Sequence, residues 1–159
     1  MKTTRLAAAA AMALACAATT ASAEEPFDAC EVFTQAEASK VLGANAETEA
    51  ANAKGKRPKV IPTCTWWVSR EGKTITASAT FRFARNEADV QRAFEDEKLR
   101  FQTKPLLIAG APAFWSAKQG TLQLLKGRTW LVVFVGGAKP SERDADASRR
   151  VAELLAKKL

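Results

Sequence analysis

The clearest pattern in the chain is a strict alternation of apolar and polar side chains over residues 74–83, which has the period of a β-strand. Residues 63–69 alternate in the same way, and the segment 70–73 between them contains Gly72 and is typical of a tight turn. The two segments therefore predict a β-hairpin with one buried and one polar face. The predicted buried face of the second strand consists of Ile75, Ala77, Ala79, Phe81 and Phe83.

Three more strands are predicted nearer the C-terminus. Residues 113–118, 121–125 and 129–135 are joined by short polar connections, which is typical of an antiparallel meander. The last of the three is apolar at nearly every position, so we expect it to be central in the sheet and covered on both sides.

The first predicted helix begins at a capping box, in which the Thr34 hydroxyl and the Glu37 carboxylate satisfy free backbone N–H groups. Gly43 is the expected end of this helix. The segment 44–62 that follows has no periodicity and is predicted to be a long surface loop. Residues 106–108 are predicted to be a short apolar link.

Two further helices are predicted, one over residues 87–102 with Asn86 as its cap and one after Ser141 at the end of the chain. Their expected inward-facing residues are Val90, Ala93, Phe94 and Phe101 in the first and Ala147, Val151, Leu154 and Leu155 in the second. The order α-ββ-α-βββ-α predicts a single α+β domain in which helices pack on a five-stranded antiparallel sheet.

The N-terminal residues 1–23 have the three parts of a secretory signal peptide. Lys2 and Arg5 form a positive start, residues 6–15 form an apolar run, and Ala-Ser-Ala ends the segment as a cleavage site. The apolar run is shorter than the roughly 20 residues that a membrane-spanning helix needs. We therefore expect residues 24–159 to be a periplasmic or secreted domain.

Cys16 offers an alternative to plain cleavage. The four residues that end at Cys16 resemble the box at which bacterial lipoproteins are cleaved and acylated, although alanine stands at the usual leucine position. Lipidation of Cys16 would anchor the domain to a membrane, and only in that case does the sequence predict a membrane contact.

Cys30 and Cys64 are the two cysteines left after such cleavage. Exported compartments are oxidising, so we expect a structural disulfide between them. A pair of free reactive thiols is the alternative, but the two residues are not in a Cys-x-x-Cys arrangement.

The chain contains no histidine and no tyrosine, which excludes histidine-activated nucleophiles and histidine metal sites. The sequence therefore predicts no catalytic residue, no metal and no cofactor. Its formal charge of +7 comes from scattered residues, which does not favour a nucleic-acid partner. One helix carries several carboxylates, for which pairing with neighbouring cations is expected rather than acid–base catalysis: Glu87, Asp89, Glu95, Asp96 and Glu97.

Several motifs together resemble a family of small exported bacterial proteins and lipoproteins of unknown function. Cys30 is followed by Thr34-Gln35-Ala36-Glu37-Ala38, and the second cysteine lies in Cys64-Thr65-Trp66 at a strand start. The motif Gly110-Ala111-Pro112-Ala113-Phe114-Trp115 then precedes a hairpin. The resemblance implies a PsbP-type α/β/α sandwich with one disulfide, and it implies no functional residues.

Candidate contact residues lie on the polar face of the predicted hairpin. Trp67 shares that face with Thr76, Ser78 and Thr80, and an exposed tryptophan beside polar side chains is typical of a contact surface unless a helix covers it. We therefore predict a non-catalytic accessory module that binds another envelope protein or a small ligand.

A basic loop suggests the main alternative function. Its cations are Lys54, Lys56, Arg57 and Lys59. If this loop protrudes into a partner's site, the chain is an inhibitor or immunity-type protein. A hydrolase that uses paired carboxylates is a third, weaker hypothesis, because it requires two carboxyl groups about 5–10 Å apart in a cleft.

Overall fold

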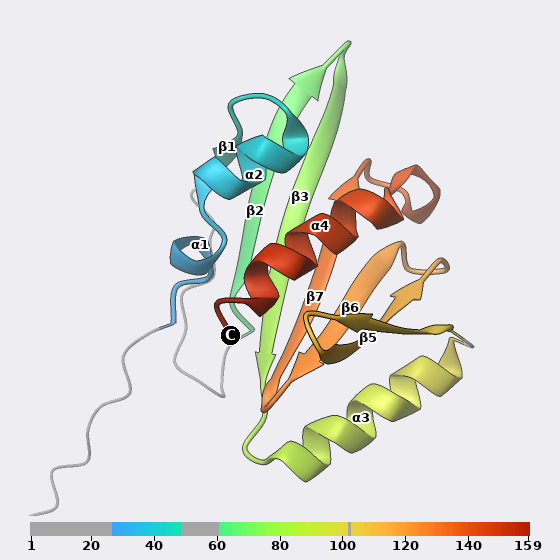
Figure 1. Ribbon diagram of the computed structural model, residues 1–159. Helices are drawn as coiled ribbons and strands as arrows, with labels where there is room; N and C mark the ends of the chain where they lie inside the picture. The colour runs from blue at the N-terminus through green and yellow to red at the C-terminus, as the bar shows by residue number, and fades with distance from the viewer. Residues whose placement is uncertain (1–26, 49–60, 102) are drawn as a thin grey trace, which may run out of the picture.

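The computed structural model describes residues 27–48, 61–101 and 103–159. Within these ranges, seven antiparallel strands form one sheet in the order β1-β2-β3-β7-β6-β5-β4 (Figure 1). The strands are β1 Glu47–Thr48, β2 Thr63–Arg70, β3 Lys73–Phe83, β4 Pro105–Ile108, β5 Ala111–Ser116, β6 Thr121–Lys126 and β7 Thr129–Gly136. The helices are α1 Ala29–Val32, α2 Gln35–Leu42, α3 Glu87–Arg100 and α4 Ala145–Ala156, with a short 3₁₀ helix, η1, at Pro140–Glu142.

The sheet has two more strands than the predicted five, and both lie at its edges. β1 falls in the predicted 44–62 loop and pairs with β2, where Glu47 lies opposite Trp67. β4 was expected to be a link, but it pairs with β5. Strands of two and four residues are too short to show an alternation, so the sequence pattern missed both.

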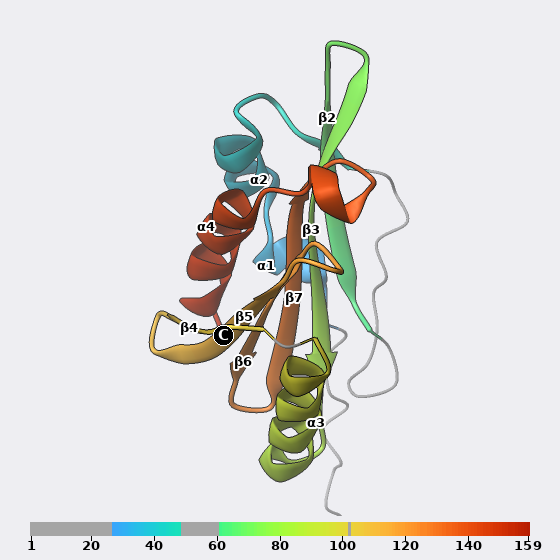
Figure 2. The same cartoon turned by 90° about the vertical axis from the view of Figure 1, so that its right-hand side faces the viewer.

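The predicted β2–β3 hairpin is confirmed and extends beyond the rest of the sheet in both views (Figures 1 and 2). Its turn has positive φ at Glu71 (50°) and Gly72 (74°), the backbone that a two-residue hairpin turn requires. β3 pairs with β7 only as far as Thr76 opposite Gly136. Among the described residues, no strand therefore lies on the β7 side of the hairpin before Thr76.

One side of the sheet carries α2 and α4, which lie together in Figure 2. Of the five predicted inner residues of β3, Ala77, Ala79 and Phe81 are fully buried, whereas Ile75 and Phe83 are half-buried. On α4, Ala147, Val151 and Leu155 are buried as expected, whereas Leu154 is only half-buried. This side holds the larger part of the hydrophobic core.

The other side of the sheet is covered at one end by α3. Val90 and Phe94 pack there against Phe114, Leu125 and Trp130. The prediction that Ala93 and Phe101 face inward from α3 is wrong. Ala93 is exposed, and Phe101 lies beyond the last helical residue and is half-buried. β7 lies between β3 and β6 with helices on both sides, as its apolar sequence predicts.

The start of the last helix differs from the prediction. Asp144, not Ser141, is the N-cap of α4, and its carboxylate accepts a hydrogen bond of 2.9 Å from the Ala147 N–H. The Asp144 N–H donates to the Val135 carbonyl at 2.7 Å, and Arg143 forms an isolated antiparallel β-bridge with Gly136. These backbone contacts hold residues 143 and 144 extended beside β7, so Ser141 lies in the short helix η1 and α4 begins only after Asp144.

A partly buried ion pair connects Lys158, near the end of the chain, with Glu37 on α2. The Glu37 carboxylate accepts hydrogen bonds from the Thr34 N–H and hydroxyl, each at 3.0 Å, and contacts Lys158 Nζ at 2.7 Å. Burial raises the pKa of Glu37, but the Lys158 and Thr34 hydrogen bonds together outweigh it and hold the pKa below its ordinary 4.5. The folded state therefore favours the charged form.

The Glu37→Gln variant is expected to unfold at a lower denaturant concentration at pH 7, because it loses the charged contact with Lys158. The free energy of unfolding should fall by only about 1–2 kcal/mol, since the Lys158 side chain is partly exposed and solvent weakens the pair. The folded-state pKa is depressed, so the stabilisation is present above pH 4.5 and is lost as the pH falls through the folded value. Urea unfolding at pH 7 and pH 3 measures this directly. The gap between wild type and variant should narrow at pH 3, and an unchanged gap would contradict the prediction.

Candidate functional site: a groove between α2, α4 and the hairpin

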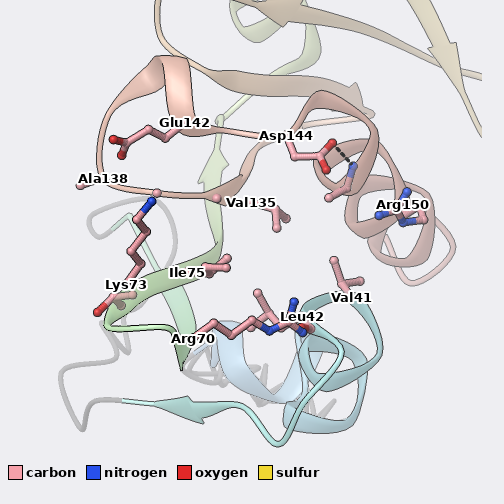
Figure 3. Close-up of a pocket in the computed structure, with 14 residues that line it drawn as sticks. Val41, Leu42, Arg70, Lys73, Ile75, Val135, Ala138, Glu142, Asp144 and Arg150 are labelled. Atoms are coloured by element: carbon pink, nitrogen blue, oxygen red, sulfur yellow. Dashed lines mark hydrogen bonds between the residues drawn. The ribbon is translucent and has the colours of Figure 1, made fainter.

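A groove of about 690 Å³ opens where the β2–β3 hairpin, the end of α2 and the start of α4 meet (Figure 3). This volume lies within the range of roughly 300–1,000 Å³ that is usual for small-molecule sites. The groove lies where β3 continues past the end of its pairing with β7, so that no described strand lies beside this part of the hairpin.

The floor of the groove is apolar. It consists of Val41 and Leu42 from α2, Ile75 from β3, Val135 from β7 and Ala147 from α4. Figure 3 shows the side chains of Val41, Ile75 and Val135 directed toward the middle of the cavity. Ile75 and Val135 continue the buried face of their strands, so the floor is an extension of the hydrophobic core.

Three cations surround this floor: Arg70, Lys73 and Arg150. Arg70 Nη2 donates to the Leu42 carbonyl at the end of α2. Lys73 and Arg150 form no ion pair with any residue in the described ranges. All three side chains are exposed, so their charge is available at the opening.

Two carboxylates also line the groove, but each is bound to backbone. Asp144 caps α4, and Glu142 accepts a hydrogen bond of 3.2 Å from the Lys139 N–H. In Figure 3 the Glu142 carboxylate points away from the floor. The three cations outnumber the two carboxylates, so the charge that lines the groove is positive on balance.

The polar hairpin face lies on the opposite side of the sheet from this groove. It brings Trp67 and Thr76 together as register partners, with Ser78 and Thr80 farther along the strand. The Ser78 hydroxyl bonds Thr65 at 3.1 Å and the Thr80 hydroxyl bonds Thr63 at 3.1 Å.

These contacts reduce what the polar face offers a partner. Ser78 is only 4% exposed. Trp67 is half-buried, and its Nε1 is buried with no hydrogen-bond partner in the part of the chain that the structure describes. The four predicted residues are neighbours on one face, but Ser78 is not accessible for contact.

Other predictions fall outside the described residues. They are the signal peptide, Cys16, and the basic loop with Lys54, Lys56, Arg57 and Lys59. The predicted disulfide between Cys30 and Cys64 is confirmed, with Cα atoms 5.1 Å apart. It joins α1 to the start of β2, and it is typical of a chain outside the reducing cytosol.

Two of the five α3 carboxylates pair with cations as expected, because Glu95 pairs with Lys98 and Glu97 lies 4.0 Å from Arg100. The Asp89 carboxylate instead accepts a hydrogen bond of 2.6 Å from the side-chain amide of Asn86. Among the described residues, no group of three or more possible ligands is arranged to hold a metal ion. None of the helices in those ranges is both long and apolar enough to cross a membrane.

The sequence did not predict the groove, because its lining residues are far apart in the chain and form no motif. Arg70 and Lys73 flank the predicted turn, and Arg150 lies 77 positions after Lys73 on the exposed side of a helix. Gly136 and Gly137, which directly follow the last predicted strand, also line the groove. A difference in length between β3 and β7 is the signal that would have indicated it.

Comparison with known proteins gives a family but no activity. The chain belongs to the family described as "Protein of unknown function (DUF3558)", whose model matches residues 2–158. No curated protein and no solved structure matches the chain. The expected membership of a family of unknown function is confirmed, while export and the likeness to PsbP stay predictions.

Proposed function

We propose that this chain is a non-catalytic binding module of the periplasm or the extracellular space, and that it holds a small ligand in the groove between α2, α4 and the hairpin. The observation that carries the proposal is the groove itself, with an apolar floor of core residues and exposed cations at its opening. Concave sites of this size with a few convergent polar groups are the usual places where ligands bind.

The compartment is supported by two observations. The Cys30–Cys64 disulfide is typical of oxidising compartments, and residues 1–23 have the pattern of a signal peptide. A non-catalytic role is supported by the composition, since the chain has no histidine to act as a general base near neutral pH.

Shifted pKa values are typical of catalytic groups, but the shifts here belong to structural residues. Glu37 pairs with Lys158, and burial lowers the pKa of Arg143, which donates to the Gln119 carbonyl at 2.9 Å and stacks on Phe134. Neither residue lines the groove. A small ligand is preferred to a protein partner because the groove is concave and Ser78 on the polar face is buried.

A groove-filling substitution tests the proposal. Val41 is half-buried and directed into the groove, whereas Lys40 is exposed on the neighbouring position of α2. The Val41→Trp variant should therefore fill the groove, and Lys40→Trp adds the same side chain outside it. Small-molecule fractions from the cell envelope are to be tested by thermal unfolding of wild type and both variants.

Fractions that raise Tm in the wild type should raise it equally in Lys40→Trp and have no effect in Val41→Trp. The expected rise is several degrees, because a ligand at 100 times its Kd stabilises the folded state by about 2.7 kcal/mol. Equal stabilisation of all three proteins would place the ligand elsewhere and contradict the proposal. Absence of any stabilising fraction would contradict it as well.

A further inference from the structure

We infer that the ligand of this groove is an anionic amphiphile, a small molecule with a carboxylate or phosphate group on a short alkyl chain. The inference rests on the proposed function and adds the chemical class of the ligand. It follows from three features of the groove: its apolar floor, its exposed cations and the fixed position of one of them.

The apolar floor of the groove favours a ligand with an alkyl chain. Val41, Ile75 and Val135 present aliphatic side chains and no polar atom toward the cavity. Transfer of alkyl groups from water to such a surface is favourable by about 0.8 kcal/mol for each buried CH₂. A sugar or peptide backbone would instead place polar groups on this floor without hydrogen-bond partners.

The cations at the opening of the groove favour a ligand with an anionic head group. Arg70, Lys73 and Arg150 come from the hairpin and from α4, and the two carboxylates nearby are bound to backbone N–H groups. A cationic head would meet three like charges there against two carboxylates that already accept backbone hydrogen bonds. An anionic head would meet guanidinium groups, which bind carboxylate and phosphate through paired hydrogen bonds.

Arg70 is positioned before any ligand binds. Its Nη2 donates to the Leu42 carbonyl, so the last turn of α2 holds the guanidinium in place. Gly43 makes this possible, because a Cβ at that residue would lie 2.8 Å from Arg70 Nη2. A cation fixed in this way loses less conformational freedom when it binds an anion.

The size of the cavity favours a small molecule over a macromolecule. About 690 Å³ accommodates a single drug-sized ligand, whereas protein interfaces are usually flatter and larger. An acidic peptide and a second copy of the chain are the other possible occupants, and the experiment below includes both.

Isothermal titration of the exported chain with four octyl compounds tests the inference, each used below the concentration at which it forms micelles. The compounds are octanoate, octyl phosphate, octyl glucoside and octyltrimethylammonium, with acetate as a probe that has no chain. We expect both anionic octyl compounds to bind at least tenfold more tightly than octyl glucoside, and octyltrimethylammonium and acetate to show no binding. The tighter of the two anions identifies the head group as carboxylate or phosphate.

Matched arginine variants test the role of the cations. Arg150 and Arg149 are adjacent exposed residues of α4, but only Arg150 lines the groove. Arg150→Met should weaken octyl phosphate binding five- to tenfold, and Arg149→Met should leave it unchanged. Arg70→Met should weaken octyl phosphate binding further. Arg70 also contacts α2, so the folding of this variant is checked by circular dichroism. The result for Arg150→Met decides the test.

Several results would overturn the inference. If octyl glucoside binds as tightly as octyl phosphate and Val41→Trp abolishes both, the groove binds ligands but does not select anions, so the proposed function survives alone. If no octyl compound binds, or an acetylated acidic peptide binds more tightly, the ligand class is wrong. If sedimentation shows a dimer that Val41→Trp dissociates, a second copy occupies the groove. Equal binding of octyl phosphate to Val41→Trp and wild type would contradict both the ligand class and the groove.

Discussion

Replacing Trp66 by alanine is expected to lower the free energy of unfolding by about 3–5 kcal/mol, measured by urea denaturation. Trp66 is 7% exposed in the core between β2 and the N-terminal helices, and its Nε1 donates to the Phe33 carbonyl at 2.8 Å. The substitution removes a large buried side chain and leaves that carbonyl without its donor. The loss would be a large part of the 5–15 kcal/mol that is typical of a whole domain.

The neighbouring residue supplies the matched control. Trp67 points to the other side of β2, is half-buried, and makes no hydrogen bond through Nε1 with a described residue. Trp67→Ala should therefore cost about 1–2 kcal/mol, in proportion to the smaller area that it buries. If Trp67→Ala is the more destabilising variant, the register of β2 is wrong by one residue and the two sides of the hairpin are exchanged.

Loss of the Cys30–Cys64 disulfide is the other large expected effect. The bond closes a loop with a sequence separation of 34 and connects α1 with the start of β2. Cys30→Ala/Cys64→Ala should lower the free energy of unfolding by about 3–4 kcal/mol, because the unlinked unfolded chain gains conformational entropy. Urea unfolding of the double variant beside oxidised wild type measures this.

Reduction of the wild type provides the control for the disulfide. Reduced wild type and the double variant should unfold at similar urea concentrations, since both lack the bond. The denatured, unreduced protein should show no alkylation of Cys30 or Cys64. Two reactive thiols at these positions, or a double variant as stable as oxidised wild type, would contradict a stabilising disulfide.

The parts of the fold that could be predicted are those with a long, regular pattern. The alternation of β3 placed Ala77, Ala79 and Phe81 in the core, where all three are fully buried. The apolar run of β7 indicated a central strand, and it lies between β3 and β6. In each case, a single side-chain period over many residues corresponds to one physical environment.

The parts that failed depend on contacts between distant segments. β1 and β4 are strands only because β2 and β5 offer them backbone partners. The start of α4 was predicted at Ser141 because that residue is a good cap, but pairing of Arg143 with Gly136 delays the helix to Asp144. A local preference is overruled in these places by hydrogen bonds that form only in the folded chain.

The candidate site was predicted least well, for the same reason. The strand alternation indicated Trp67 and the hydroxyl residues of the hairpin, but in the structure Ser78 is buried and its hydroxyl is hydrogen-bonded to Thr65. The groove lies on the other side of the sheet and takes its cations from β2, β3 and α4. Its residues share no motif, because each is placed by the end of a strand or helix rather than by a sequence pattern.

Photo-crosslinking in the producing cell is the most direct test of the claim that this groove holds a small ligand. A benzophenone amino acid is introduced in place of Ala138, an exposed residue at the groove, or in place of Ala93, an exposed residue of α3. After irradiation, intact mass spectrometry should show a small-molecule adduct at position 138 and none at position 93. Equal adducts at both positions, no adduct at 138, or an adduct there with the mass of a protein would contradict the account.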